Sequence, residues 1–356
     1  MPTSLALQAA SAAQFIKESW PLARDRASQV SNTKFREIIL CGCGDSHHAA
    51  YALSYALADW TGRTTHGLHA MEAARYAVPR SIGEDLLLVG ISASGETART
   101  IEAIRLAKDL GAQTLAITAV SESTLAVLAD DVFALELPDQ PQGPGLISYL
   151  AALLTGYALG AELANGQLQQ QIDRYLNEMP EVLSDWSAGE LAKGHDAAQE
   201  TDHAQPILFL GSGPVRGAAM FAAAKVIEAA GQSASSQDVE EWAHLEYFND
   251  PARLPVWMLS ADGRASGREL EIEQAAETIG RTFINSKWSY GSQSLREVLS
   301  PLALWTGPVA YADSLMVRLG ERPFRGFSGG RDRAEGGGIS RIRSSEQLPS
   351  LKDLSN

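Results

Sequence analysis

The chain has 356 residues, of which 45% are apolar and 20% are charged, and its formal net charge at pH 7 is -14. This composition excludes a disordered chain, a collagen and a small disulfide-stapled domain. The acidic balance also excludes a basic footprint over the whole chain, so no nucleic-acid partner is expected. Length alone favours two domains, because domains usually hold about 100–200 residues.

The N-terminus and the cysteines indicate where the protein works. Residues 1–4 hold no basic residue, so a secretory signal is not expected. Cys41 and Cys43 lie two residues apart, which suits neither an ordinary disulfide nor a closed zinc site. The longest uncharged apolar stretch, 146–160, is shorter than the roughly 20 residues that cross a bilayer. We therefore expect a cytoplasmic protein with no metal and no membrane partner, and a buried interdomain helix at 146–160.

Residues 1–30 are predicted to be helical, and short apolar runs then alternate with helical patterns. The predicted strands are Glu37–Leu40, Leu86–Ile91, Gln113–Ile117 and Val132–Leu137, and the predicted helices are Ser46–Asp59, Thr97–Leu110 and Ser123–Leu128. Such alternation predicts a parallel sheet with helices on both faces.

The two halves of the chain are similar to each other. Residues 38–62 and 207–231 both read as an apolar run, a Gly-x-Gly turn and a helical stretch that ends in glycine. The repeated glycines keep one spacing: Gly42, Gly44 and Gly62 in the first copy, Gly211, Gly213 and Gly231 in the second. We expect an α/β protein of two tandem doubly wound parallel-sheet domains, 31–165 and 205–320, joined by a helical linker, 166–204.

The C-terminal segment differs in charge from the rest of the chain. Residues 321–356 hold seven Lys or Arg and five Asp or Glu, so this segment is positive while the remainder is negative. Its glycine clusters predict a flexible tail. Both a solvated tail and a cationic flap over an anion site stay open.

Two polar turns follow predicted strands of the first copy, each where a strand passes into a helix. Residues 92–97 read Ser-Ala-Ser-Gly-Glu-Thr, and residues 43–46 read Cys-Gly-Asp-Ser. Hydroxyls and free N–H groups at a helix N-terminus make an anion cradle. Because open α/β sheets bind ligands at the carboxyl ends of their strands, both turns are expected at one crevice. Ordinary helix capping, with Ser94 as the cap of the second turn, is the competing explanation.

These two turns resemble the sugar-phosphate loops of the SIS (sugar isomerase) domain family. The resemblance covers about residues 35–325 as two tandem copies, which resemble the isomerase half of glucosamine-6-phosphate synthase, fructoselysine-6-phosphate deglycase and amino-sugar-phosphate deaminases. It implies a flavodoxin-like or Rossmann-like fold for each copy. It also implies that the second turn holds the substrate phosphate and that the first contacts the sugar. The residues concerned are Ser92, Ala93, Ser94 and Thr97 of the second turn and Gly44, Asp45 and Ser46 of the first.

The second copy has lost the hydroxyls of the first. Val215 stands where the first copy has Ser46, and Asp262 stands where it has Ser94. A carboxylate repels a phosphate, so we expect phosphate binding in the first copy and another role in the second.

That other role is suggested by a second motif. Lys225 and Glu228 are three residues apart and share a helix face, and His244 follows Glu228 after sixteen residues. The resemblance implies that Glu228 is the proton-transfer base and that Lys225 supports it. It also implies that His244, supplied by the neighbouring subunit, opens the sugar ring.

The sequence departs from the family pattern at three places. Residues 241–246 read Glu-Trp-Ala-His-Leu-Glu where the family has E-x-x-H-G-P, and Asp45 stands where a neutral residue is common. His47 and His48 follow, and both packing and substrate contact stay open for them. They point about 100° apart on a helix, which makes a poor metal pair.

We therefore expect an enzyme for aldose–ketose isomerisation at C1 and C2 of a phosphorylated sugar, through an enediolate and without a cofactor. A base must reach both carbons, and opening a hemiacetal suits a histidine. The implied assembly is a homodimer with a composite active site. Alternatives are a deaminase or deglycase of an amino- or amine-linked hexose phosphate, and a non-catalytic sugar-phosphate sensor. Another tetrahedral anion, such as a sulfonate, is the alternative to phosphate.

Overall fold

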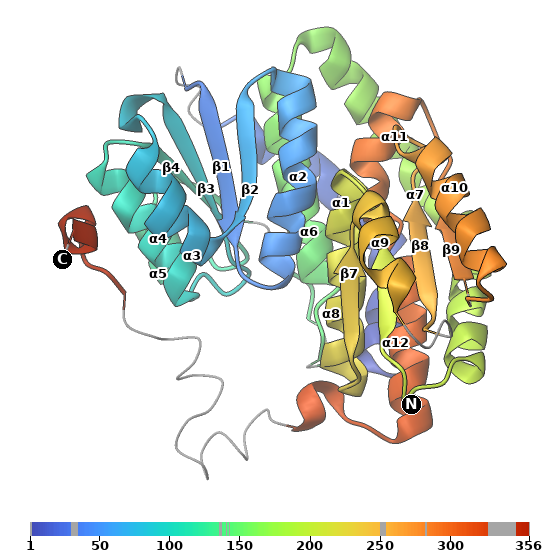
Figure 1. Ribbon diagram of the computed structural model, residues 1–356. Helices are drawn as coiled ribbons and strands as arrows, with labels where there is room; N and C mark the ends of the chain where they lie inside the picture. The colour runs from blue at the N-terminus through green and yellow to red at the C-terminus, as the bar shows by residue number, and fades with distance from the viewer. Residues whose placement is uncertain are drawn as a thin grey trace. The chain divides into compact units, whose positions relative to one another are not determined.

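The computed structural model describes residues 2–29, 35–134, 137–139, 141, 143–249, 254–281, 283–326 and 347–355 (Figure 1). They form two compact units, and separate stretches of the chain contribute to each. The first-sheet unit holds the described residues of 15–139, 147–176 and 347–355, and the second-sheet unit those of 2–14, 141–146 and 177–326.

The first-sheet unit is built on five parallel strands in the order β2-β1-β3-β4-β5. This is the flavodoxin-like order of a doubly wound sheet. The strands are β1 (Glu37–Gly42), β2 (Thr64–His69), β3 (Leu86–Ile91), β4 (Gln113–Thr118) and β5 (Asp131–Ala134). The helices are α2 (Asp45–Thr61), α3 (Ala70–Glu72), α4 (Ala98–Asp109), α5 (Thr124–Leu128) and α6 (Ile147–Leu163). Helices α1 (Ser4–Ala27) and α7 (Gly166–Glu200) contribute residues to both units.

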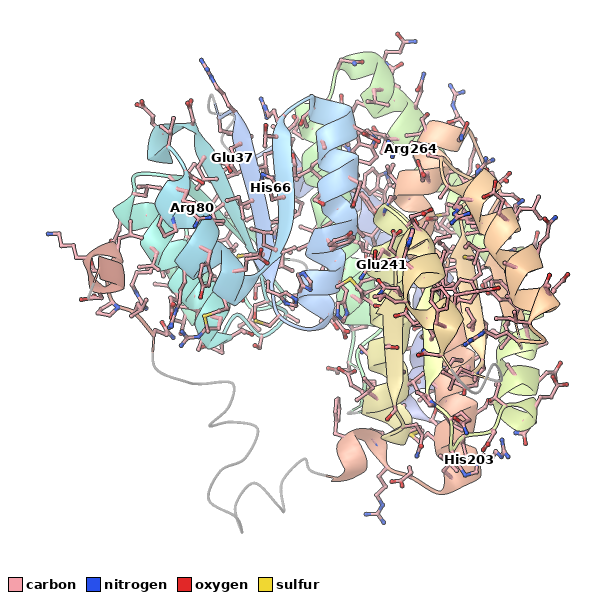
Figure 2. All side chains as sticks on the ribbon, in the orientation of Figure 1. Glu37, His66, Arg80, His203, Glu241 and Arg264 are labelled. Atoms are coloured by element: carbon pink, nitrogen blue, oxygen red, sulfur yellow. The ribbon has the colours of Figure 1, made fainter. Side chains whose placement is uncertain are left out.

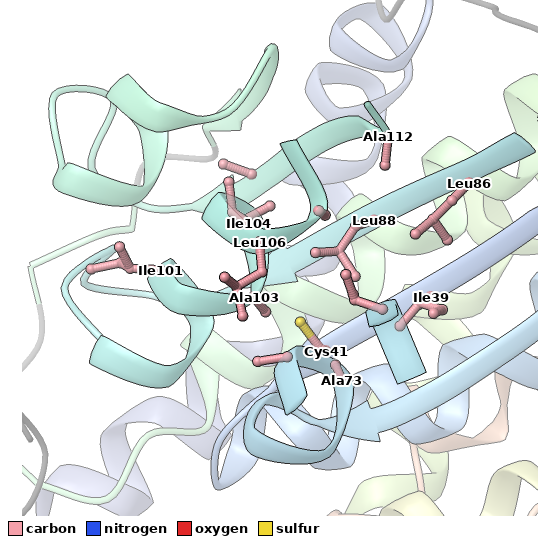
Figure 3. Packing of buried hydrophobic residues seen from close by; sticks show 14 of the residues in the cluster. Ile39, Cys41, Ala73, Leu86, Leu88, Ile101, Ala103, Ile104, Leu106 and Ala112 are labelled. Carbon is pink, nitrogen blue, oxygen red and sulfur yellow. The ribbon is translucent and has the colours of Figure 1, made fainter. Parts of the chain in front are cut away.

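Both faces of this sheet are covered, which explains why its inner strands are continuous apolar runs. Figure 1 shows α3, α4 and α5 on one side of the strands and α2 and α6 on the other. Ile39, Cys41 and Leu88 pack against Ile104 of α4 in the core cluster drawn in Figure 3. The predicted buried helix is α6, whose residues 147 and 149–161 are buried while Ser148 is half-buried.

The strand predictions are confirmed, but β2 was missed. Strand β2 reads Thr-Thr-His-Gly-Leu-His, and its side chains are only exposed or half-buried. An edge strand of this kind lacks the apolar run by which the other strands were found. The predicted strand at 132–137 is shorter than expected, because β5 ends at Ala134 and residues 135–136 lie outside the described part.

The second-sheet unit repeats this plan with four parallel strands in the order β7-β6-β8-β9. The strands are β6 (Ile207–Leu210), β7 (Ala234–Gln237), β8 (Val256–Ser260) and β9 (Phe283–Lys287). The helices are α8 (Pro214–Ala230), α9 (Val239–His244), α10 (Ser266–Thr278), α11 (Gln293–Leu299) and α12 (Thr306–Leu319). Trp242 of α9 and Ile272 of α10 pack on one face of the sheet, and Trp257 of β8 contacts Tyr311 of α12 on the other.

The internal repeat is confirmed by the backbone. Gly44 and Gly213 precede α2 and α8 with nearly the same torsion angles, φ 56° and ψ -130° against φ 56° and ψ -132°. Gly62 and Gly231 end these helices in the left-handed conformation, at φ 66° and 64°. Both glycine pairs adopt angles that other residues avoid. The two copies therefore share one strand–turn–helix geometry.

Three expectations about absent features concern the described residues alone. Among them, no helix is both long and apolar enough to cross a membrane. No group of three or more His, Cys, Asp or Glu in the same ranges is arranged to hold a metal ion. Cys41 is buried and Cys43 is exposed. The expected flexible tail, 321–356, lies mostly outside the described residues.

The described C-terminal residues pack on α4. Glu102 of α4 is fully buried, and its carboxylate accepts hydrogen bonds from Arg75 Nε at 2.7 Å and from Arg99. The backbone N–H of Leu348 donates to Glu102 Oε2 at 3.1 Å, and Leu351 packs against the core cluster. A buried charge is tolerated only when its hydrogen-bonding groups are satisfied, and Leu348 supplies one of these partners.

Replacing Gly67 by alanine tests how closely β2 packs on α2. A Cβ at Gly67 would lie 2.4 Å from the Ala50 carbonyl oxygen and 2.6 Å from Tyr51 Cα, so backbone must move. Overpacking of this kind costs about 1–3 kcal/mol, and Gly67→Ala should lower the free energy of unfolding in urea by that amount. Gly166→Ala is the matched control in the same unit, because its Cβ meets nothing within 4 Å. Equal stability of the two variants would contradict the packing described.

Candidate functional site

The second polar turn folds into a cup of hydroxyls in front of α4. Ser92 Oγ lies 3.0 Å from Thr97 Oγ1, and Gly95 N donates to Ser92 Oγ at 3.1 Å. Ser92 is buried at the base of the turn, while Ala93 and Ser94 are exposed. The N-cap of α4 is Thr97, whose side chain makes no capping bond. The capping interpretation with Ser94 is therefore wrong, and Ser94 Oγ instead accepts a hydrogen bond from Glu96 N at 3.2 Å within the turn.

The loop between β4 and α5 holds this turn in place through hydrogen bonds and close packing. Glu96 accepts hydrogen bonds from Thr124 N and Thr124 Oγ1, both at 2.8 Å, and the backbone bond most of all lowers the pKa of Glu96. Gly95 has φ 68°, and a Cβ there would lie 2.0 Å from Ser123 Oγ. The sequence did not single out Ser123 or Thr124. Their position just beyond the predicted strand at 113–117 is the signal that could have found them.

The first polar turn brings Ser46 to the same edge of the sheet. A Cβ at Gly42 would lie 2.6 Å from Ser46 Cβ, so the turn of α2 sits directly on the end of β1. Gly44 makes the turn with its positive φ, and Asp45 Oδ1 lies 3.6 Å from His48 Nδ1. Asp45 thus has a cationic partner available whenever His48 is protonated.

A narrow cavity joins the two turns, as predicted from the carboxyl ends of the strands. Its volume is about 20 Å³, which holds about one water molecule and no sugar. Its polar lining includes residues that were not predicted, on β4 and α6. The lining residues used here are Ser46, Ala93, Thr118, Ser148 and Thr155.

His47 is packed as a neutral side chain. Its ring stacks on His69 of β2 with centroids 3.5 Å apart, and the residue is 4% exposed. Burial above all, followed by the charges of His69 and His48, lowers the pKa of His47 to about 3. The partner His69 was missed because the strand that carries it was missed.

The matching loop of the second copy carries its own negative charge. The Asp262 carboxylate lies 2.9 Å from Lys287 Nζ and 3.5 Å from Arg296 Nη2, and the bond from Lys287 chiefly lowers its pKa. Val215, in place of the Ser46 hydroxyl, is 3% exposed. The cations that face this loop are thus paired with a side chain of the same copy.

Lys225 and Glu228 share a face of α8, as predicted, and they form an ion pair. Lys225 is fully buried, and its Nζ lies 2.5 Å from Glu228 Oε2 and 3.2 Å from the Gly145 carbonyl oxygen. The ammonium also sits 4.8 Å from the Phe221 ring centroid. The Glu228 side chain is 27% exposed, so a carboxylate fixed by a buried cation reaches the surface of this unit.

His244 is the last residue of α9 and lies at the surface. Its Nε2 is 3.0 Å from Glu240 Oε1, and Glu240 also accepts from Arg268 Nε at 2.7 Å. The His244 side chain is 65% exposed. Glu241, labelled in Figure 2, is exposed on the same helix. Within this chain the imidazole is bonded to Glu240 and not to Glu228.

The comparisons with known proteins concern first the copy that carries the two polar turns. Residues 33–161 match the family model described as SIS domain. Glutamine–fructose-6-phosphate aminotransferase [isomerizing] of Mycobacterium leprae is 28% identical over 247 residues, which are 67% of this chain and 39% of that protein. The chain thus spans about two fifths of the length of this relative.

Solved structures show the same fold over most of the chain. The C-terminal domain of glucosamine-fructose-6-phosphate aminotransferase from Francisella tularensis aligns with a TM-score of 0.78 and 16% identity, over 91% of this chain and 98% of that one. Glucosamine-6-phosphate deaminase from Thermotoga maritima aligns with a TM-score of 0.70 and 17% identity, over 89% and 95%. At these identities the likeness concerns the fold.

Removing the Ser94 hydroxyl tests the anion cradle directly. Ser94→Ala should weaken the binding of inorganic phosphate by about 1.5–3 kcal/mol, the usual strength of a hydrogen bond to a charged group. Isothermal titration with phosphate measures the loss. Ser121→Ala, at an exposed serine of the β4–α5 loop, is the control and should bind as the wild type does. Equal affinity in the two variants would remove Ser94 from the cradle.

Proposed function

We propose that the protein is an aldose–ketose isomerase that acts on a phosphorylated sugar, a proposal supported by the match of residues 33–161 to the SIS domain model. The observation that carries this proposal is the hydroxyl cup of residues 92–97 together with the fixed carboxylate of Glu228. The proposal assigns phosphate binding to the first-sheet unit and proton transfer to the second-sheet unit.

The cup suits a phosphate for three physical reasons. The hydroxyls of Ser92 and Thr97 face each other, so both can turn toward one anion. Ala93 and Ser94 are exposed beside them. The N-terminus of α4 adds the positive end of the helix dipole. A tetrahedral dianion would accept hydrogen bonds from all of these groups.

Glu228 suits a proton shuttle. Moving a proton from C1 to C2 of an open-chain sugar needs one base that serves both carbons in turn, with an enediolate between the two transfers. The buried ammonium of Lys225 holds the Glu228 carboxylate in place at 2.5 Å. Lys225 is a positioning residue in this scheme, while Glu228 takes the proton from one carbon and returns it to the other.

His244 is proposed to open the sugar ring. Ring opening moves a proton to the ring oxygen and another from the anomeric hydroxyl, which suits a group that titrates near neutrality. The exposed imidazole can reach a molecule outside its own unit, and Glu240 lies against its Nε2.

Amine release is the second candidate. The structural relative from Thermotoga maritima is a glucosamine-6-phosphate deaminase, and Asp45 places a carboxylate in the sugar-side turn, where an amine would find a charge partner. The same cradle and base would then serve an amino- or amine-linked hexose phosphate. Release of the amine, not the isomerisation, would be the net reaction.

A panel of sugar phosphates in D₂O distinguishes these reactions. Wild type should introduce deuterium at C1 or C2 of one compound among fructose 6-phosphate, glucose 6-phosphate, glucosamine 6-phosphate and an amine-linked fructose 6-phosphate, as read by mass spectrometry. Glu228→Gln should lower kcat by about 10²–10⁴, the usual scale of general acid–base catalysis. Its affinity should stay within about threefold, or roughly 0.6 kcal/mol.

Glu277→Gln, on an exposed position of α10, is the matched control and should exchange as the wild type does. Deuterium uptake without amine loss supports the isomerase, and amine release supports the deaminase or deglycase. Binding of a sugar phosphate without either reaction would contradict both enzyme proposals and would support a non-catalytic sensor. Normal turnover by Glu228→Gln would move the base elsewhere.

We further propose that the working unit is a two-fold homodimer, in which Glu228 and His244 of one site come from different copies. Mixing Glu228→Gln chains with His244→Ala chains should then restore part of the activity, because one site of each hybrid regains both groups. No recovery, or a fully active monomer in sedimentation, would contradict the composite site. Two cysteines that lie two residues apart in one segment suit a reducing compartment, and we propose that the protein works in the cytoplasm.

A further inference from the structure

The segment that carries His244 has few anchors of its own. Helix α9 ends at His244, the backbone of Leu245 leaves the helical region at φ -125° and ψ -73°, and Glu246–Phe248 forms a short 3₁₀ turn. The side chains of Leu245 and Phe248 are 55% and 75% exposed, so they do not anchor the segment within its unit. Tyr247, which lies between them, packs against the core of the second sheet, with its ring centroid 5.6 Å from that of Trp242. Beyond this one side chain, the backbone of the turn is held by contacts from another element.

Arg281 follows α10 and precedes β9, and its side chain contacts the segment after His244. The residue is only 4% exposed, and its Nη2 donates to the carbonyl oxygens of Glu246 and Asn249, both at 3.2 Å. Its guanidinium carbon lies 5.7 Å from the Trp242 ring centroid, a cation–π distance. The arginine therefore contacts the chain two residues before His244 and at both ends of the turn after it.

A second layer supports the same turn. Gln237 Nε2 donates to Glu246 Oε1 at 3.1 Å, and Arg216 Nη1 donates to Gln237 Oε1 at 3.0 Å. Burial lowers the pKa of Arg281, while the Glu246 charge opposes that shift. The Glu246 side chain is thus held from β7 and its carbonyl from Arg281.

Stability alone does not explain a buried arginine at this place. Its Nε and Nη1 are buried without a hydrogen-bond partner among the described residues. Leaving such groups unpaired costs free energy, and an apolar side chain of similar volume often stabilises as well or better. What an apolar side chain cannot do is hold two carbonyl oxygens at once, which a planar guanidinium does.

We propose that Arg281 is a positioning residue for His244. By binding the Glu246 and Asn249 carbonyls and stacking on Trp242, it fixes the end of α9 from which the imidazole must reach the ring oxygen of the substrate. This inference rests on the proposed function, in which His244 opens the ring and Glu228 moves the proton. It predicts that losing Arg281 harms ring opening and spares proton transfer.

The test compares a ring-closed substrate with one that cannot close. The panel above supplies the ketohexose phosphate, fructose 6-phosphate, and its partner is 5-deoxyfructose 6-phosphate, which lacks the hydroxyl that forms the furanose ring. With the cyclic substrate, Arg281→Met should lower the rate of deuterium exchange by about 10- to 100-fold, since a misplacement of about 1 Å can cost roughly 100-fold. With the open-chain compound, its rate should stay within about twofold of wild type.

Four further variants distinguish a selective loss of ring opening from a general loss of activity. His244→Ala should show the same selective loss, and Glu228→Gln should lose activity on both compounds. Arg281→Lys keeps one donor and the charge, so it should recover part of the loss and carries the test if Arg281→Met does not fold. Arg318→Met is the matched control, because Arg318 Nη1 also donates to two carbonyls of the unit, those of Ala198 and Thr201, away from the His244 segment. It should leave both rates near wild type.

An equal loss on both compounds, or no loss on either, in Arg281→Met would overturn the positioning role. Those results leave the proposed function standing, because wild type still exchanges the substrates. If wild type exchanges another compound of the panel instead, that compound and its 5-deoxy analogue take the places of these two. If wild type exchanges no compound of the panel, the proposed function fails and the role of Arg281 fails with it.

Discussion

In both copies the helix after the first strand begins directly against the end of that strand. Only a glycine at the end of the strand leaves enough space for this contact. A Cβ at Gly42 would come within 2.6 Å of Ser46 Cβ, and one at Gly211 within 2.9 Å of Val215 Cγ1. This contact sets where the N-termini of α2 and α8 lie relative to the carboxyl edge of each sheet. The two polar turns of the first copy, residues 43–46 and 92–97, lie at that edge.

The same contact lets the copies diverge without changing the fold. The residue that meets the glycine is Ser46 in one copy and Val215 in the other, so one turn presents a hydroxyl and the other a hydrocarbon. At the next strand the first copy has Ser94, and the second has Asp262 with Lys287 and Arg296 around it. One loop thus presents a neutral hydroxyl, and the other presents a carboxylate that is paired with cations of its own copy.

Much of the architecture could be predicted from the sequence, because buried parallel strands are continuous apolar runs and the turns keep their glycines. The predicted strands, the shared helix face of Lys225 and Glu228 and the meeting of the two polar turns all follow from sequence pattern, from spacing or from the rules of open α/β sheets. Strand β2 was missed because its side chains are polar and half-exposed. Contacts between distant segments were missed for a different reason: no local pattern ties Glu96 to Thr124, or Arg281 to the turn after His244.

The buried carboxylate of Glu102 has a consequence for the order in which the protein is made. Its partners Arg75 and Arg99 are nearby in sequence, but the backbone N–H of Leu348 is synthesised 246 residues later, after the whole second sheet. While the ribosome is still translating that stretch, the Glu102 carboxylate in the helix layer over the first sheet lacks its hydrogen bond from Leu348 N. The first copy therefore reaches its finished state only after release of the C-terminal residues, and the part translated earliest is among the last to be completed.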